Sequence, residues 1–139
     1  KKMGFTDIQE AKRFVRESGC DWLSVAVGSV HGAIAEGLKD KKKPTAKLDV
    51  AHIRALREAL GIPLVLHGGS GIDQSYIVQG VRAGIAKINV GTEIRQPYER
   101  VIAQGGSVPE AQDAVYRRTG ELIRDFLQVK DSADKLAAR

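Results

Sequence analysis

Residues 62–71 read IPLVLHGGSG, and this stretch decides the fold. Its first five residues form a short apolar run, which is typical of a strand buried on both faces of a parallel sheet. The run ends at His67, and the glycine-rich turn after it leads into an amphipathic segment, residues 73–83. A buried strand, a turn and a helix in this order predict one unit of a parallel α/β sheet.

The same order occurs in two further places along the chain. Apolar runs at residues 22–27 and 85–88 are followed by Gly28-Ser29-Val30-His31-Gly32 and by Asn89-Val90-Gly91-Thr92, respectively. Helices are expected from Thr6 to near Gly19, from Asp49 to Leu60, over 73–83, over 92–103 and from about 109 to 129. Alternating strands and helices predict a parallel sheet with right-handed crossovers.

Helix caps can also be assigned from the sequence. Thr6 and Gln9 have the spacing of a capping box, in which the Thr6 hydroxyl accepts a backbone N–H and Gln9 reaches back. Asp49 is expected to cap the second helix, and Gly61 is expected to end it.

Composition excludes several classes of protein. The chain has 139 residues, 42% hydrophobic and 28% charged, and no apolar run approaches the roughly 20 residues of a membrane helix. The net charge of +5 is concentrated partly in the lysine-rich residues 39–43, and aromatic residues are only 5% of the chain, so nucleic-acid binding by base stacking is not expected. The single cysteine, Cys20, cannot form an internal disulfide, and this favours a cytoplasmic protein.

Two histidines stand at the ends of successive expected strands. His31 and His67 are separated by 36 positions, but neighbouring parallel strands lie about 4.8 Å apart, so both imidazoles can converge on one metal ion. Zinc binds imidazole nitrogen, and catalytic zinc sites use three protein ligands and keep one position open. Each histidine could instead simply cap a strand end. The third histidine, His52, lies in the middle of an expected helix, where a surface role is expected.

The glycine-rich turn and the third strand end predict an anion site. Gly68, Gly69 and Gly71 permit positive φ and close backbone approach, so their N–H groups can surround a phosphate, with the Ser70 hydroxyl as a further donor. Asn89 is expected to point toward the site centre and to meet a substrate hydroxyl or a developing oxyanion, although it could serve only to stabilise the turn. Lys87 is expected to make a structural ion pair.

With these residues in hand, the chain resembles the class II, metal-dependent ketose-bisphosphate aldolases, which include the fructose- and tagatose-bisphosphate aldolases. The resemblance covers nearly the whole chain, and its strongest segments are residues 27–32, 63–71 and 86–95. It implies the C-terminal part of a TIM (β/α)8 barrel, with about three βα units followed by C-terminal helices. Residues 1–139 are then the C-terminal portion of one barrel domain and not a complete domain.

The resemblance also implies roles for single residues. His31 and His67 are similar to two of the three zinc-binding histidines of the family. Gly32, Gly68, Gly69 and Ser70 are similar to one phosphate-side binding segment for dihydroxyacetone phosphate, and Asn89, Val90, Gly91 and Thr92 to the second, with Asn89 near the reacting enediolate. Backbone oxygens at Val30, Gly32, Gly68 and Ser70 match positions that hold a monovalent cation in the family.

The implied reaction is the reversible cleavage of a ketose 1,6-bisphosphate to dihydroxyacetone phosphate and glyceraldehyde 3-phosphate, as in glycolysis. Fructose 1,6-bisphosphate is the expected substrate, and zinc or another divalent metal is the expected cofactor. The third zinc histidine and the proton-transfer Asp and Glu of the family match no position here. We therefore expect this segment alone not to catalyse cleavage, and we expect it to work with N-terminal barrel strands in a homo-oligomer.

Three alternatives stay open at this point. The first is a tagatose-bisphosphate aldolase, since the C4 epimer is not determined by these motifs. The second is another phosphate-binding barrel enzyme, an isomerase or synthase, that uses the same loops without a metal. The third is a non-catalytic sugar-phosphate-binding fragment.

Overall fold

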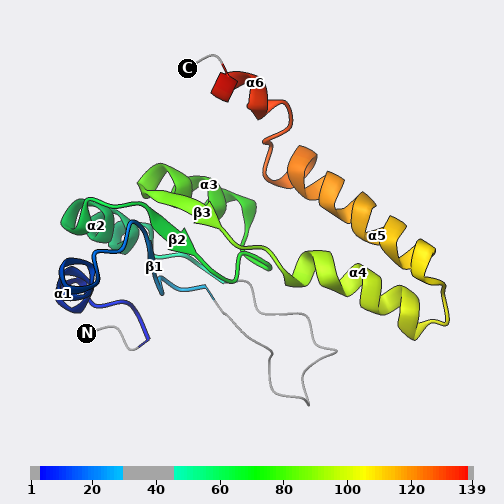
Figure 1. Cartoon of the computed structure of the whole chain (residues 1–139), viewed down its shortest axis with the longest axis horizontal. Helices are drawn as coiled ribbons and strands as arrows, with labels where there is room; N and C mark the ends of the chain where they lie inside the picture. The colour runs from blue at the N-terminus through cyan, green and yellow to red at the C-terminus, as the bar shows by residue number, and fades with distance from the viewer. Residues whose placement is uncertain (1–3, 30–45, 138–139) are drawn as a thin grey trace. The chain divides into compact units, whose positions relative to one another are not determined.

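Three parallel strands, in the order β1-β2-β3, form the only sheet among residues 4–29 and 46–137, the part of the chain that this computed structural model describes. They are β1 (Leu23–Ser24), β2 (Leu64–Leu66) and β3 (Ile85–Ile88) (Figure 1). The expected parallel sheet is confirmed. β1 is shorter than the expected run over 22–27 because its paired register with β2 covers only Leu23 and Ser24.

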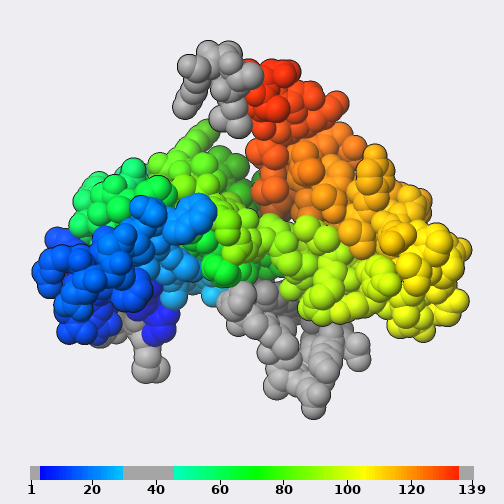
Figure 2. All heavy atoms as spheres, viewed as in Figure 1, coloured from blue at the N-terminus to red at the C-terminus, as the bar shows by residue number. Residues whose placement is uncertain are grey.

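Helices alternate with these strands in the first unit of the chain, residues 1–90. They are α1 (Ile8–Ser18), α2 (Val50–Leu60) and α3 (Gln74–Ala83). Because the strand order follows the sequence, crossovers of the usual right hand place α2 and α3 on the same face of the sheet. α1 packs beside α2 and buries only Ala11, so most of its side chains lie on the surface (Figure 2).

The strand register divides the sheet into two different faces. Ser24 pairs with Val65, and Val65 pairs with Lys87, so these three residues share one face. A register shift between Leu64 and Val65 leaves one extra residue in β3, because Leu64 pairs with Ile85 and Val65 pairs with Lys87, so Ile85 and Lys87 lie on opposite faces. The other face is apolar and packs on the helices, with Leu64, Leu66 and Ile85 buried. Ser24 and Lys87 are exposed, so the side chains available for binding lie on the face away from the helices.

Helix caps follow the sequence with one correction. Asp7 caps α1, not Thr6: the Asp7 carboxylate accepts the N–H groups of Gln9 and Glu10. The predicted Thr6–Gln9 capping box is therefore wrong, because the Thr6 hydroxyl accepts the distant Ala26 N–H at 2.8 Å instead. This contact ties the start of α1 to the chain that follows β1.

The start and the end of α2 are as expected. The Asp49 carboxylate accepts the His52 N–H at 3.0 Å, and Gly61 ends the helix in the left-handed conformation. The backbone N–H of Asp49 also donates to the Val27 carbonyl, at 2.9 Å, so the same residue ties α2 to the segment after β1.

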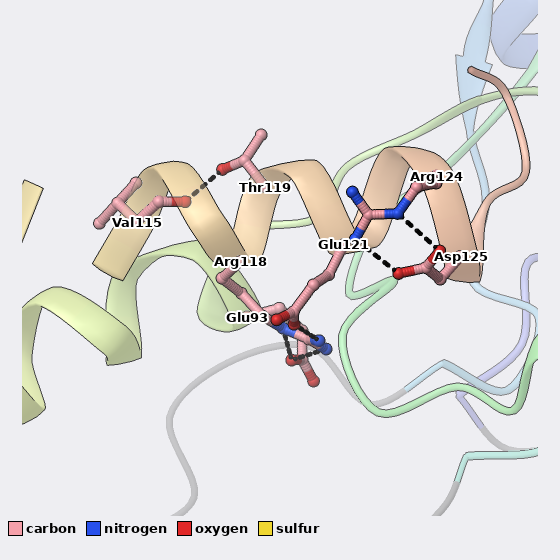
Figure 3. Close-up of polar contacts among 7 residues, drawn as sticks. All are labelled: Glu93, Val115, Arg118, Thr119, Glu121, Arg124 and Asp125. Carbon is pink, nitrogen blue, oxygen red and sulfur yellow. Dashed lines mark hydrogen bonds and ion pairs between the residues drawn. The ribbon is translucent and has the colours of Figure 1, made fainter. Parts of the chain in front are cut away.

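The second unit, residues 91–139, is helical. It contains α4 (Thr92–Ala103), α5 (Val108–Glu121), a π-helical turn (Leu122–Phe126) and α6 (Ser132–Ala137). α4 packs against α5, and Arg118 of α5 donates to Glu93 of α4 at 2.8 Å and to Glu121 at 2.9 Å (Figure 3). These bonds raise the pKa of Arg118, which stays charged and links the two helices.

The expected single helix over 109–129 is interrupted. Leu127 N–H donates to the Leu122 carbonyl, five residues back, which is the π-helical pattern. Gln128 then adopts a positive φ of 54° and ends the turn. Ser107 and Glu110 form a complete capping box at the start of α5, and the bonds from Ser107 lower the pKa of Glu110.

Within the described residues, no helix is both long enough and apolar enough to cross a membrane. That residues 1–139 are one portion of a single barrel domain stays a prediction.

The contact between Asp49 and His52 predicts a stability effect. Asp49→Ala removes the acceptor of an α2 N-terminal N–H and should lower the free energy of unfolding of the complete polypeptide by about 1 kcal/mol. Asp49→Asn keeps a capping oxygen and serves as the matched control, with a much smaller loss. Urea unfolding followed by circular dichroism measures both, and equal losses for the two variants would contradict the capping role.

Candidate active site

His67 follows β2 directly, at the carboxyl end of the sheet, and its side chain is exposed. The strand beneath it is fully apolar, with Leu64, Val65 and Leu66 all buried. Packing of these three residues fixes the strand, and the next residue then projects its imidazole into the region where parallel α/β sheets bind ligands.

Asn89 is brought to His67 by backbone pairing beyond the strand ends. The Asn89 N–H donates to the Leu66 carbonyl at 2.9 Å, and the Asn89 carbonyl accepts the Gly69 N–H at 3.1 Å. The Asn89 side-chain amide nitrogen, Nδ2, then lies 3.1 Å from Nε2 and 3.3 Å from Nδ1 of His67. An amide donor and an imidazole thus meet at the ends of two neighbouring strands.

Lys87 is a third polar residue on the same face, and the structure shows a contact that the sequence analysis did not predict. Its Nζ donates to Asn89 Oδ1 at 2.8 Å and lies 5.7 Å from the ring centroid of Trp22. Lys87 makes no ion pair with any described residue, and the expected structural ion pair stays a prediction. The signal that could have found the Asn89 contact is the period of a strand, because residues 87 and 89 point to the same face.

The glycine-rich turn packs tightly on the end of β3. Gly68 and Gly71 adopt positive φ values of 72° and 82°, as expected for this turn. A Cβ added at Gly69 would lie 2.7 Å from Ile88 Cγ2, so this glycine is required by packing against the next strand. Ser70 is buried, with 5% of its surface exposed.

The N-terminus of α3 follows this turn, and a side chain of the protein already accepts a hydrogen bond from one of its first backbone N–H groups. The Asp73 carboxylate accepts the Ser75 N–H at 2.8 Å, and the contact with Ser75 lowers the pKa of Asp73. The ionised carboxylate offsets the positive end of the helix dipole. An anion bound at this turn is therefore expected to meet the turn's own amide groups and not the first turn of α3.

The segment after Asn89 opens α4 as the sequence predicts. Val90 lies near the glycine turn, where its Cγ2 would be 3.1 Å from a Cβ at Gly69. The Gly91 carbonyl accepts the N–H groups of Ile94 and Arg95, both at 3.0 Å, and Thr92 is the first residue of the helix.

Val30, His31 and Gly32 lie outside the described residues, so convergence of His31 with His67 stays a prediction.

In the described part of the chain, one side chain at the strand ends, that of His67, is a suitable metal ligand. His67 offers an exposed imidazole, a ligand type that suits zinc and several other divalent metals. Among residues 4–29 and 46–137, no three His, Cys, Asp or Glu side chains gather at one point, so a metal site at His67 would need further ligands from outside these ranges.

His52 has a structural environment away from these strand ends. Its Nε2 lies 2.7 Å from the Thr6 carbonyl, and its ring meets Phe5 edge-on at 5.8 Å between centroids. It lines a cavity of about 330 Å³ together with Phe5 and Asp49. The expected surface role is thus replaced by a half-buried contact between α2 and the start of α1.

Comparison with known families decides the relationship. The family model described as fructose-bisphosphate aldolase class-II matches residues 1–134, nearly the whole chain. The chain belongs to this family. The segments that contain His67 and Asn89 both lie within the residues that match the family model.

Solved structures agree with this family assignment. The YdjI aldolase from Escherichia coli K12 is 34% identical, with a TM-score of 0.71 over 88% of this chain and 46% of that one. A Coccidioides immitis protein proposed to be a fructose-1,6-bisphosphate aldolase is 26% identical, with a TM-score of 0.76 over 94% of this chain and 46% of that one.

A third structure supports the fold alone. The fructose-bisphosphate aldolase of Campylobacter jejuni is 14% identical, with a TM-score of 0.62 over 90% of this chain and 45% of that one. The chain spans about half the length of these structures, and its α/β architecture is that of a partial TIM (β/α)8 barrel, as expected.

The close approach at Gly69 predicts a large packing effect. Gly69→Ala should destabilise the complete polypeptide by about 1–3 kcal/mol, because the new methyl group overlaps Ile88 and displaces the turn. Gly120→Ala is the control: a Cβ there meets nothing within 4 Å, and in α5 it should stabilise by about 0.5–1 kcal/mol. Opposite signs in urea unfolding are expected, and a neutral Gly69→Ala would contradict the packing account.

Proposed function

We propose that this chain forms the His67 and Asn89 side of a metal-dependent ketose-bisphosphate aldolase site. The observation that carries the proposal is the contact of Asn89 Nδ2 with the His67 ring at the ends of β2 and β3. Membership of the class II fructose-bisphosphate aldolase family supports it. The proposed reaction is reversible cleavage of fructose 1,6-bisphosphate to dihydroxyacetone phosphate and glyceraldehyde 3-phosphate.

His67 would hold the metal together with His31. A divalent cation such as zinc supplies Lewis-acid polarisation of the ketone oxygen when bound. Imidazole ligands suit this chemistry, and the exposed position of His67 leaves its ring accessible. The monovalent cation and the third zinc histidine remain expectations from the family resemblance.

Asn89 supplies the polar group next to the reacting carbons. Its Nδ2 can only donate hydrogen bonds and cannot accept them. A bond from Nδ2 to the substrate oxygen becomes stronger as negative charge develops on that oxygen during C–C cleavage. Backbone pairing with Leu66 and Gly69 holds Asn89 in place before substrate arrives. Such a fixed donor lowers the barrier without reorganisation at the moment of reaction.

The substrate phosphate is assigned to the amide-rich turn and the segment that opens α4. Gly68, Gly69 and Ser70 form the first binding segment, and the family resemblance adds Gly32 to it. Val90, Gly91 and Thr92 form the second. Positive φ at Gly68 supports this assignment, because such turns direct successive N–H groups toward an anion.

The biological setting follows from the family. Sugar phosphates are the expected substrates, and the chain takes part in carbohydrate metabolism. A cytoplasmic homo-oligomer is proposed, and the single cysteine supports a reducing compartment.

Metal removal tests the proposed reaction. The complete polypeptide should contain about one divalent metal per subunit. It should release dihydroxyacetone phosphate from fructose 1,6-bisphosphate, lose this activity in EDTA and regain it with zinc. Tagatose 1,6-bisphosphate in a parallel assay reports the C4 preference. Cleavage that EDTA leaves unchanged, or a protein that binds no metal, would overturn the roles of His31 and His67.

Replacement of Asn89 tests its role as a donor. Asn89→Ala should lower kcat by about 10²–10³-fold, the usual effect of removing one oxyanion donor. The metal content should stay unchanged, because Asn89 is not a ligand in this proposal. An increase in KM with kcat unchanged would show that Asn89 only binds substrate.

A further inference from the structure

Lys87 contacts the proposed site, but the proposed reaction gives it no role. Its ammonium donates to Asn89 Oδ1 at 2.8 Å, on the same face of the sheet as His67. It has no ion pair within the described ranges that would account for its charge. Because Lys87 bonds directly to the amide of Asn89, we look for its role in the effect that this bond has on the amide.

The bond to Lys87 determines which way the Asn89 amide faces. An amide group has one acceptor end and one donor end, whereas a lysine ammonium can only donate. Oδ1 must therefore face Lys87, and this leaves Nδ2 facing His67, where it lies 3.1 Å from Nε2. A flipped amide would place N–H groups against the ammonium and present the wrong end to a developing oxyanion.

Trp22 in turn restrains Lys87. The indole ring of Trp22, which directly precedes β1, lies 5.7 Å from Lys87 Nζ, so the ammonium is attracted to the ring face. Val65 of β2 pairs with Lys87 and with Ser24, and it is buried although its neighbours on this face are exposed. Trp22, next to β1, thus restrains the Lys87 ammonium from across β2.

We propose that Lys87 is a positioning residue that holds the Asn89 amide with Nδ2 toward the metal side of the site, and that Trp22 holds Lys87. The catalytic consequence rests on the proposed aldolase function, whereas the orientation of the amide does not. The orientation of the amide and the aldolase function can therefore be tested separately.

A double-mutant cycle in the complete polypeptide tests the catalytic consequence. Lys87→Met should lower kcat about 10-fold with KM changed less than about threefold, because a charge-assisted bond to a transition-state donor is lost. Lys87→Arg restores a cationic donor and should recover most of the activity. Lys12→Met, on the exposed surface of α1, is the matched control and should leave kcat unchanged.

The cycle separates action through Asn89 from direct action on substrate. If Lys87 acts through the amide, Lys87→Met added to Asn89→Ala should lower kcat no further than Asn89→Ala alone. Two losses that multiply in the double variant would overturn the proposal, because Lys87 would then act on its own.

An activity-free measurement tests the orientation itself. The side-chain amide of Asn89 in the complete polypeptide can be followed by 15N NMR and assigned as the resonance that disappears in Asn89→Ala. The resonance should shift in Lys87→Met, shift less in Trp22→Leu and return close to its original position in Lys87→Arg. A resonance that stays in place in Lys87→Met overturns the proposal whatever the activity. A shift without aldol cleavage by the unmodified protein would support the positioning role and reject the proposed function.

Discussion

The pairing of β2 with β3 continues past the ends of both strands, and the candidate site depends on this continuation. Asn89 N–H donates to the Leu66 carbonyl, and the Asn89 carbonyl accepts the Gly69 N–H. Two backbone bonds therefore join the strand before His67, the turn after it and the residue that contacts its ring. The short approach at Gly69, which leaves no room for a Cβ, comes from the same pairing.

A single sheet face collects the polar side chains that this pairing aligns. Helices cover the apolar face, where Leu64, Leu66 and Ile85 are buried, and the opposite face presents His67 and Lys87. In the barrel fold of this family, substrates bind at the carboxyl ends of the strands, which is where His67 and Asn89 lie. On this face the ammonium of Lys87 contacts the amide of Asn89, and the amide contacts the imidazole of His67.

Local signals in the sequence predicted much of this fold, and long-range contacts account for the rest. β3, the start of α4 and the Asp49 cap follow from apolar periodicity and capping chemistry within a few residues. The Thr6 prediction failed because its hydroxyl bonds to Ala26, twenty residues away, which no local pattern reveals. The Lys87 contact was accessible from strand period alone, whereas its restraint by Trp22 required the strand order.

The most direct test of the central claim is the position of the metal relative to His67. A crystal structure of the zinc-loaded complete polypeptide with dihydroxyacetone phosphate, with data collected at the zinc absorption edge, locates the ion unambiguously. The account predicts an anomalous peak at about 2.0–2.1 Å from ring nitrogens of His67 and His31, with Asn89 Nδ2 facing the bound substrate. A peak bound by other residues, with His67 still turned to Asn89, would contradict it.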